Sequence, residues 1–309
     1  MKFILPILLF VQIACKTTGN DCDPIPEHIF PLVKNSDKVP STLIVSHFTI
    51  DNNFIMRAVD NHKEYAKKHH YDYWFRNGII DGKSFENPGH EKCIFKIGLY
   101  WQKIKAIEDA FAIQENGQNK YEWVMWVDGD AVFTDMDKSV DDLLKEVGGE
   151  NSYFIITKDI SSCVNAGVFL IRNNTQGREL IANVRKSFDN YKSEGFPEQI
   201  AIEDFIYGLA KFKDNELQVA KFDKTKKCGF SPVSGVKIID QSYMNAFYSV
   251  NFKPNTRWKA GMYIAHFAGD PVREINLPQL LDCMELNKKN LSDCEYLGKY
   301  HQNIHQKSK

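Results

Sequence analysis

The segment that most constrains the fold is an apolar pentapeptide followed directly by two acids. Residues 123–127 read Trp-Val-Met-Trp-Val, and Asp128-Gly129-Asp130 follow them. An uninterrupted apolar run of this length is typical of a central strand that is buried on both faces of a parallel sheet. Ligands of open α/β sheets bind outside the carboxyl ends of the strands, which is where this acid pair lies.

Asp128 and Asp130 are candidate ligands of one cation. Residues two apart in an extended chain point the same way, so the two carboxylates can converge. Their hard oxygen atoms suit Mg²⁺ or Mn²⁺, either of which would neutralise a diphosphate. The alternative is a polar exit from the strand, in which the two acids are merely solvated. Gly129 would lie at the centre of either arrangement.

Hydrophobic periodicity on both sides of this segment predicts an α/β fold with a mostly parallel central sheet flanked by helices. A strand, a helix and a second strand precede the acid pair, which is a βαβ opening. A long amphipathic helix then leads into the apolar strand. The predicted strands cover 42–46, 71–75, 123–127, 165–173 and 262–270, and the predicted helices cover 54–69, 95–112, 180–188 and 202–210.

Composition excludes several classes of protein. The 309 residues are 43% apolar and 26% charged, so the chain is neither disordered nor fibrous. Lys and Arg number 39 against 40 Asp and Glu, which gives a net charge of -1. A dedicated nucleic-acid-binding protein would show a basic excess, so we expect no nucleic-acid partner.

The N-terminal residues predict export. The apolar run from Phe3 to Ala14 is too short to span a bilayer and suits a secretory signal, assigned to residues 1–19. The alternative is a buried helix. Cys15 follows a weak lipoprotein-like pattern, so lipidation in a bacterium is a second alternative. We expect no transmembrane span in the mature chain, a linker over 20–40, the catalytic domain over 41–270 and a wrapping extension over 271–309.

Cysteine usage agrees with an exported protein. Six cysteines remain without Cys15, which permits three disulfides with fifteen connectivities. Only the short loop Cys283–Cys294 is a specific prediction. No Cys-x-x-Cys occurs, so zinc is not expected. Sequons for N-glycosylation begin at Asn173 and Asn290.

Four further side chains have both a functional and a structural interpretation. His266 ends an apolar strand, and a lone histidine is more often structural than a ligand. Glu203 and Asp204 begin a predicted helical stretch, where the helix dipole alone would favour acids. Lys103 on the helix before the apolar strand could contact phosphate, but a solvated helix face is the preferred interpretation.

Three blocks of the sequence resemble the galactosyl/mannosyl/xylosyl transferase family, the thirty-fourth family of glycosyltransferases. EWVMWVDGDAVFTDM at 122–136 is close to that family's WIWWxDxDAxFTDM. NAGVFLIRN at 165–173 is close to NTGSFLIRN, and HFAG at 266–269 is close to HFVG. The resemblance spans residues 42–270.

This resemblance implies a GT-A fold, a nucleotide-sugar donor, Mn²⁺ and retention at the anomeric carbon. It makes Asp128, Asp130 and His266 the metal ligands, and it places Asn165 and Gly167 beside the donor sugar. The implied reaction moves a hexose or pentose of the galactose, xylose or mannose type from a UDP-sugar to a glycan hydroxyl. The metal would stabilise charge on the leaving UDP.

The chain also departs from the family pattern. The family has Asp-Asp-Gln before a helix near the reacting carbon, and Asp204 with Glu203 is taken as its counterpart. Phe205 then replaces the Gln. Asp270-Pro271 replace the Cys and Lys that follow HFVG, which removes a basic group expected near the phosphates.

Two other functions remain as alternatives. An apolar strand followed by Asp-x-Asp also resembles the signature of haloacid-dehalogenase phosphatases, in which the first Asp is a nucleophile. An inactive, exported carbohydrate-binding relative would use the abundant aromatic residues instead. Nucleotide sugars are supplied to the eukaryotic secretory pathway, so a transferase is expected in the ER or Golgi lumen or secreted.

Overall fold

A computed structural model of the chain describes residues 28–35, 41–48, 53–87, 98–160, 162–220, 224–248, 254–287 and 291–296. The predicted signal peptide with Cys15, and the sequon at Asn290, lie outside these ranges. No helix in the described part is both long and apolar enough to cross a bilayer.

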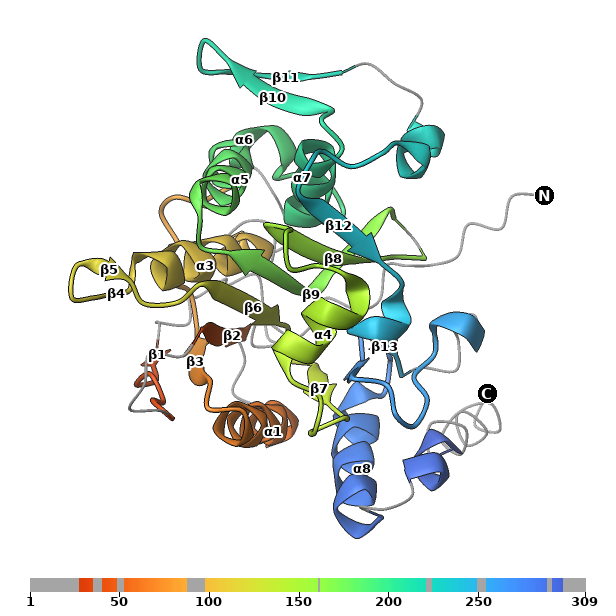
Figure 1. Cartoon of the computed structure of the whole chain (residues 1–309). Helices are drawn as coiled ribbons and strands as arrows, with labels where there is room; N and C mark the ends of the chain where they lie inside the picture. Colours follow the sequence, from red (N-terminus) through yellow and green to blue (C-terminus); the bar gives the residue numbers. More distant parts are fainter. Residues whose placement is uncertain are drawn as a thin grey trace, which may run out of the picture.

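A seven-stranded sheet forms the centre of the molecule (Figure 1). Its strands, in spatial order, are β1 (His28–Ile29), β3 (Asp72–Asn77), β2 (Thr42–Phe48), β6 (Trp123–Val127), β9 (Val164–Arg172), β8 (Phe154–Lys158) and β12 (Val236–Ile239). Strands β3, β2, β6, β8 and β12 share one direction. Strand β9 runs against both of its neighbours, and the edge strand β1 runs against β3. The sheet is therefore mostly parallel, with one inserted and one edge antiparallel strand.

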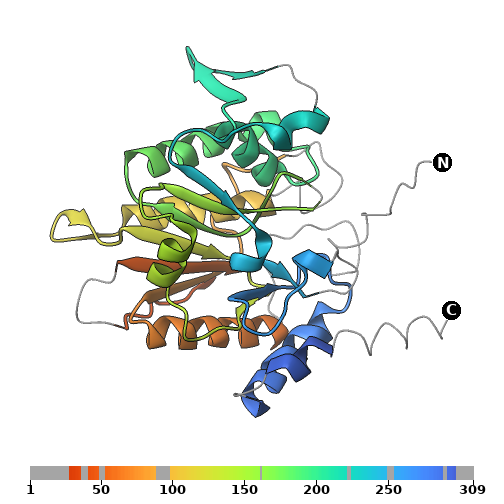
Figure 2. The same ribbon diagram turned by 45° about the vertical axis from the view of Figure 1, so that its right-hand side comes forward.

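Helices cover both faces of this sheet (Figure 2). One face packs against α1 (Asn53–Lys68), α4 (Val140–Val147) and α8 (Arg273–Leu286). The other packs against α3 (Gln102–Ala112), α5 (Thr175–Lys186), α6 (Phe188–Tyr191) and α7 (Pro197–Ile206).

Strand β6 belongs to both cores, because successive side chains of a strand point to opposite faces. Met125 and Val127 pack in the core with α1, whereas Val124 and Trp126 pack in the core with α3. The prediction that this apolar strand is buried on both faces is confirmed.

A second sheet of three strands joins the end of β6 to the C-terminal part of the chain. It contains β13 (Ala246–Phe247), β14 (Ile264–His266) and β7 (Ala131–Phe133). Strand β7 begins directly after the acid pair and runs antiparallel to β14, with His266 opposite Ala131. This register brings His266 to the two acids.

The remaining elements are short. Two hairpins project from the body, β4 (Gln114–Glu115) with β5 (Gln118–Asn119), and β10 (Ala210–Lys213) with β11 (Glu216–Val219). Short 3-10 helices in the described segments are η1 (Leu99–Trp101), η2 (Lys224–Gly229), η3 (Gln241–Tyr243), η4 (Pro254–Thr256) and η5 (Leu291–Tyr296). Disulfides join Cys163 to Cys228 and, as predicted, Cys283 to Cys294.

The predicted start of one helix, at residue 202, is five residues too late. Helix α7 begins at Pro197, because proline suits the first helical position, where its missing N–H is not needed. Glu203 and Asp204 therefore lie in the last turn of α7, not at its start. The interpretation that the helix dipole stabilises these two acids is wrong, since the C-terminal end of a helix disfavours negative charge.

Candidate metal centre

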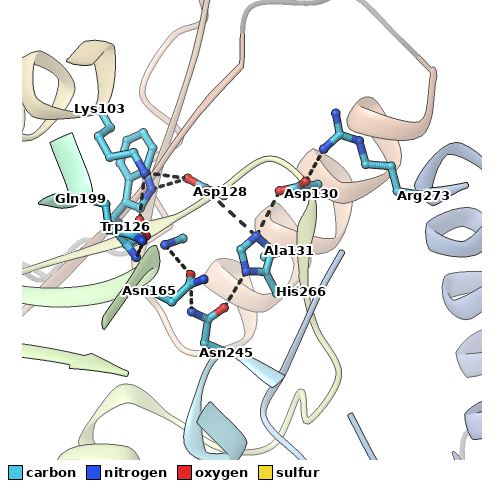
Figure 3. A network of polar contacts seen from close by, with 12 residues as sticks. Lys103, Trp126, Asp128, Asp130, Ala131, Asn165, Gln199, Asn245, His266 and Arg273 are labelled. Carbon is cyan, nitrogen blue, oxygen red and sulfur yellow. Dashed lines mark hydrogen bonds and ion pairs between the residues drawn. The ribbon is translucent and has the colours of Figure 1, made fainter. Parts of the chain in front are cut away.

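The carboxylates of Asp128 and Asp130 and the imidazole of His266 converge at the end of β6 (Figure 3). His266 Nε2 lies 3.3 Å from Asp130 Oδ1 and 4.0 Å from Asp128 Oδ2. One ligand atom from each residue lies within 4.8 Å of the others. Asp130 and His266 are buried, and Asp128 is partly exposed, so the cluster is open on the side of Asp128.

The backbone fixes the two acids where strand β6 passes into β7. The N–H of Asp128 donates to Gly167 O at 2.8 Å, and the N–H of Ala131 donates back to Asp128 O at 3.0 Å, which closes a tight turn. The N–H of Phe267 donates to Asp130 O at 2.9 Å, so the residue after His266 is tied to the second acid. The three ligands are therefore held by main-chain bonds.

Each acid has one oxygen bound to the protein and the other directed to the cluster. Asp128 Oδ1 accepts from Trp126 Nε1 at 2.7 Å and lies 3.4 Å from Lys103 Nζ. Asp130 Oδ2 accepts from Arg273 Nη1 at 2.7 Å. The oxygens nearest to His266 are Oδ2 of Asp128 and Oδ1 of Asp130.

The histidine is oriented in the same manner. Asn245 Nδ2 donates to Asn165 Oδ1 at 2.7 Å, so the amide oxygen of Asn245 faces His266 Nδ1, 2.7 Å away. That oxygen only accepts, so Nδ1 carries a proton and Nε2 is directed to the two acids. Such a partner on the outer nitrogen is the usual support of a metal-binding histidine. The same Asn165 oxygen accepts from Gly167 N at 2.9 Å.

Two glycines permit the close packing. A Cβ on Gly167 would lie 2.2 Å from His266 Cε1, so any side chain there would displace the imidazole. A Cβ on Gly129 would lie 2.5 Å from Phe48 Cδ2. Gly167 therefore lies against the imidazole of His266.

Electrostatics keep Asp130 charged. Burial alone would raise the pKa of its carboxyl, but hydrogen bonding with His266 and the charge of Arg273 outweigh burial and hold this pKa well below its usual range.

Lys103 is buried, so the interpretation of a solvated helix face is wrong. Its Nζ donates to Ala166 O at 2.9 Å and lies 3.1 Å from Glu198 Oε1. Burial lowers the pKa of this amine, but the negative charges of Asp128 and Glu198 raise it by more. The net effect is a raised pKa, which keeps Lys103 protonated. The pKa of Glu198 is raised, mainly by burial, and the charge of Lys103 offsets part of this increase.

Glu203 and Asp204 have other partners. Glu203 Oε1 accepts from the N–H groups of Cys163 and Val164 at 3.0 and 3.2 Å. Lys227 Nζ lies 2.9 Å from Glu203 Oε2 and also pairs with Asp204. The remaining Asp204 oxygen accepts from Tyr191 at 2.8 Å. Among the described residues, no hydrogen bond or ion pair joins either acid to Asp128, Asp130 or His266.

Sequence reasoning missed the acid and amide that do lie beside the centre. Glu198 and Gln199 occupy the first turn of α7, and Gln199 Oε1 accepts from Ala166 N at 2.9 Å. An acid followed by Gln at a helix start is the pattern expected of the family. Pro197 marks that helix start, so this signal could have found the pair.

A basic group is also present at the centre. The missing lysine after HFAG suggested that none would remain there. Arg273, at the start of α8, pairs with Asp130 instead. No local pattern marks Arg273, because only the docking of α8 brings it to the acid.

Comparisons with known proteins agree with this geometry. Residues 40–148, which include both acids, match the galactosyl transferase GMA12/MNN10 family. A 152-residue stretch is 30% identical to "Glycosyltransferase 6" of Arabidopsis thaliana, covering 47% of this chain and 29% of the relative. A 133-residue stretch is 31% identical to "Galactomannan galactosyltransferase 1" of Cyamopsis tetragonoloba, covering 41% and 26%. The matches thus span less than a third of these relatives' own length.

A third relative is more distant but is covered further. It is an alpha-1,2-galactosyltransferase of Schizosaccharomyces pombe, 23% identical over 200 residues, with 53% of this chain and 50% of the relative covered. The similarity to this relative thus covers about half of each chain.

A solved structure shows the same fold. It is a glycosyltransferase involved in the glycosylation of the major capsid of PBCV-1, and it superposes with a TM-score of 0.53 at 12% identity. The superposition covers 77% of this chain and 98% of that structure. The predicted GT-A-like α/β fold is confirmed. This removes the basis of the phosphatase alternative, which depended on an apolar strand followed by Asp-x-Asp. Over residues 40–148 the chain resembles the galactosyl transferase GMA12/MNN10 family, and it is similar to named glycosyltransferases over part of their length.

Proposed function

We propose that this protein is a metal-dependent glycosyltransferase. It moves a hexose or pentose of the galactose, xylose or mannose type from a nucleotide-diphosphate sugar, with UDP as the nucleotide, to a glycan hydroxyl with retention. The observation that carries this proposal is the convergence of Asp128, Asp130 and His266 at the end of β6. The match to the galactosyl transferase family and the fold shared with a solved glycosyltransferase support glycosyl transfer as the reaction class.

The donor set fits Mn²⁺, and Mg²⁺ is the alternative. Two carboxylates and one imidazole combine hard oxygen with nitrogen, which suits Mn²⁺ better than an all-nitrogen or a thiolate site would. When bound, the metal would stabilise the charge that develops on the leaving diphosphate. Asp128, Asp130 and His266 would hold it, and their outer atoms are already bound to the protein.

The chain's own residues would shape the donor pocket. Asn165 and Gly167 border the ligands, and Glu198 with Gln199 lie on the other side of Ala166. Because the partners of Asp204 and Glu203 lie elsewhere, we assign the contact with the donor sugar to the residues around Ala166.

The proposed compartment is the ER or Golgi lumen or the exterior of the cell. Two disulfides support an oxidising environment. Glycosylation of the protein at Asn173 is disfavoured, because this residue is 7% exposed and its Nδ2 donates to Phe111 O at 3.4 Å.

Calorimetric titration of UDP into the purified protein, with and without Mn²⁺, tests the proposal. We expect binding that requires Mn²⁺ and that is lost in Asp128→Ala/Asp130→Ala. Asp137→Ala is the matched control, because this acid is exposed and its carboxylate pairs with Lys68. Positive binding would justify screening UDP-sugars for turnover.

Two results would count against the proposal. UDP binding that is indifferent to Mn²⁺ and to the acid pair would exclude the metal centre as the nucleotide site. No binding of any nucleotide diphosphate would favour the inactive, carbohydrate-binding relative.

A further inference from the structure

A buried ammonium group connects four elements beside the metal centre. Lys103 on α3 contacts Ala166 O on β9, Glu198 on α7 and Asp128 in the turn after β6. The whole residue is only 8% exposed. Its three N–H donors thus meet three acceptors from separate parts of the chain, and Figure 3 shows Lys103 and Trp126 on the side of Asp128 away from His266.

Glu198 is buried without full pairing. It is 3% exposed, and its Oε1 lies 3.1 Å from Lys103 Nζ. Its Oε2 has no hydrogen-bond partner among the described residues. A buried carboxylate in a helix start costs free energy that must be offset elsewhere. The charge of Lys103 is the nearest compensation for it.

We propose that Lys103 and Glu198 form a clamp that positions Asp128 as a metal ligand. With the hydrogen bond from Trp126 alone, the Asp128 carboxylate could still rotate about that one contact. A second contact from Lys103 to the same Oδ1 fixes the carboxylate, so that Oδ2 faces His266. Glu198 balances the ammonium, which otherwise would repel the incoming cation. This inference rests on the proposed function, because it requires a metal at the centre.

Charge alone makes the opposite prediction for loss of the lysine. Lys103 and Arg273 offset two of the three carboxylates of Asp128, Asp130 and Glu198, which leaves one net negative charge. Removal of Lys103 makes the centre more negative, so a purely electrostatic role predicts tighter metal binding. A positioning role predicts weaker binding. The sign of the change separates the two roles.

The test is titration of Mn²⁺ alone, followed by the loss of the free-ion electron paramagnetic resonance signal, on the full chain. We expect Lys103→Met to weaken Mn²⁺ binding about 10- to 100-fold, the range typical of residues that orient metal ligands. The double variant Lys103→Met/Glu198→Met keeps the net charge and removes the unpaired buried acid. It should be more stable than Lys103→Met and still bind Mn²⁺ about 10- to 100-fold more weakly than wild type.

Lys105→Met is the matched control, because Lys105 lies on the same helix and pairs with Asp109. It should bind Mn²⁺ like wild type. Unchanged or tighter binding by folded Lys103→Met, or by the double variant, overturns the clamp and leaves the proposed function intact. Absence of Mn²⁺ binding by the wild-type protein overturns both.

Discussion

Two buried clusters of acids lie on either side of the segment 163–167, and only one of them is arranged to accept a cation. The first contains Asp128, Asp130 and His266. The second contains Glu203, Asp204 and Lys227, in which the ammonium pairs with both carboxylates. Each cluster has two carboxylates, and Asp128 is the one partly exposed residue among the six.

The position of the cations separates the two clusters. In the second, Lys227 lies between the acids, so the place that a metal would take is filled by a side chain. In the first, Lys103 and Arg273 contact the outer oxygens, so the inner oxygens and His266 Nε2 face one another. A pair of buried acids therefore indicates a metal site only where the cations lie behind the acids.

The largest effect should come from Lys227→Met. It leaves two buried carboxylates without their cation, which should lower the free energy of unfolding by about 3–5 kcal/mol. Urea denaturation measures this loss. Mn²⁺ binding of the folded fraction should stay at the wild-type value, because the ion-pair partners of Lys227 in the described part of the chain are Glu203 and Asp204, not the metal ligands.

Neutralisation of both acids provides the control for that variant. Glu203→Gln/Asp204→Asn in the Lys227→Met background should regain much of the lost stability. If Lys227→Met instead abolished Mn²⁺ binding in a folded protein, the two clusters would be one functional unit.

Gly167→Ala should have the next largest effect, and it acts on the first cluster alone. Its Cβ would meet His266 Cε1 at 2.2 Å and would push the imidazole away from the acids. We expect Mn²⁺ affinity to fall about 100-fold, or ~2.7 kcal/mol. Gly195→Ala is the matched control, since a Cβ there meets nothing within 4 Å. Equal Mn²⁺ affinity of the two variants would show that the placement of His266 does not matter.

Asn245→Leu should have the smallest effect of the three. It removes the acceptor for His266 Nδ1 and so releases the orientation of the ring. Mn²⁺ binding should weaken about 10-fold, at the low end for such partners, because the main-chain pairing of β14 with β7 remains. Asn245→Asp keeps an acceptor and should bind at least as well as wild type. Weak binding by Asn245→Asp would point to Asn165, the other partner of this amide, as the important contact.

Local pattern was sufficient for β6 and for the acid pair. The apolar run at 123–127 predicts a doubly buried strand because burial on both faces leaves no polar position, and the acids follow at its end. His266 was predicted from the resemblance, since a single histidine after a strand carries no such signal.

Residues whose role depends on packing between distant elements could not be found in this way. Lys103 lies on a helix whose polar positions look solvated, and only the docking of α7 covers it. Glu203 and Asp204 were predicted as the catalytic acids because the start of the helix was predicted too late in the sequence. Helix α7 begins at Pro197. The apolar pattern of β9 predicts a buried strand but not its direction. The antiparallel direction follows from how the chain connects the strands, which the local sequence does not show.

The contact between Arg273 and Asp130 joins residues 143 positions apart. His266 also reaches the acids only through β14, near the end of the described chain. During synthesis on the ribosome, the sheet strands up to β12 emerge before His266 and Arg273. The nascent chain therefore holds the acid pair without its histidine, and competence to bind metal arises only once β14 has paired and α8 has docked. Metal loading would then follow synthesis of α8 and would distinguish molecules that contain it from those truncated before it.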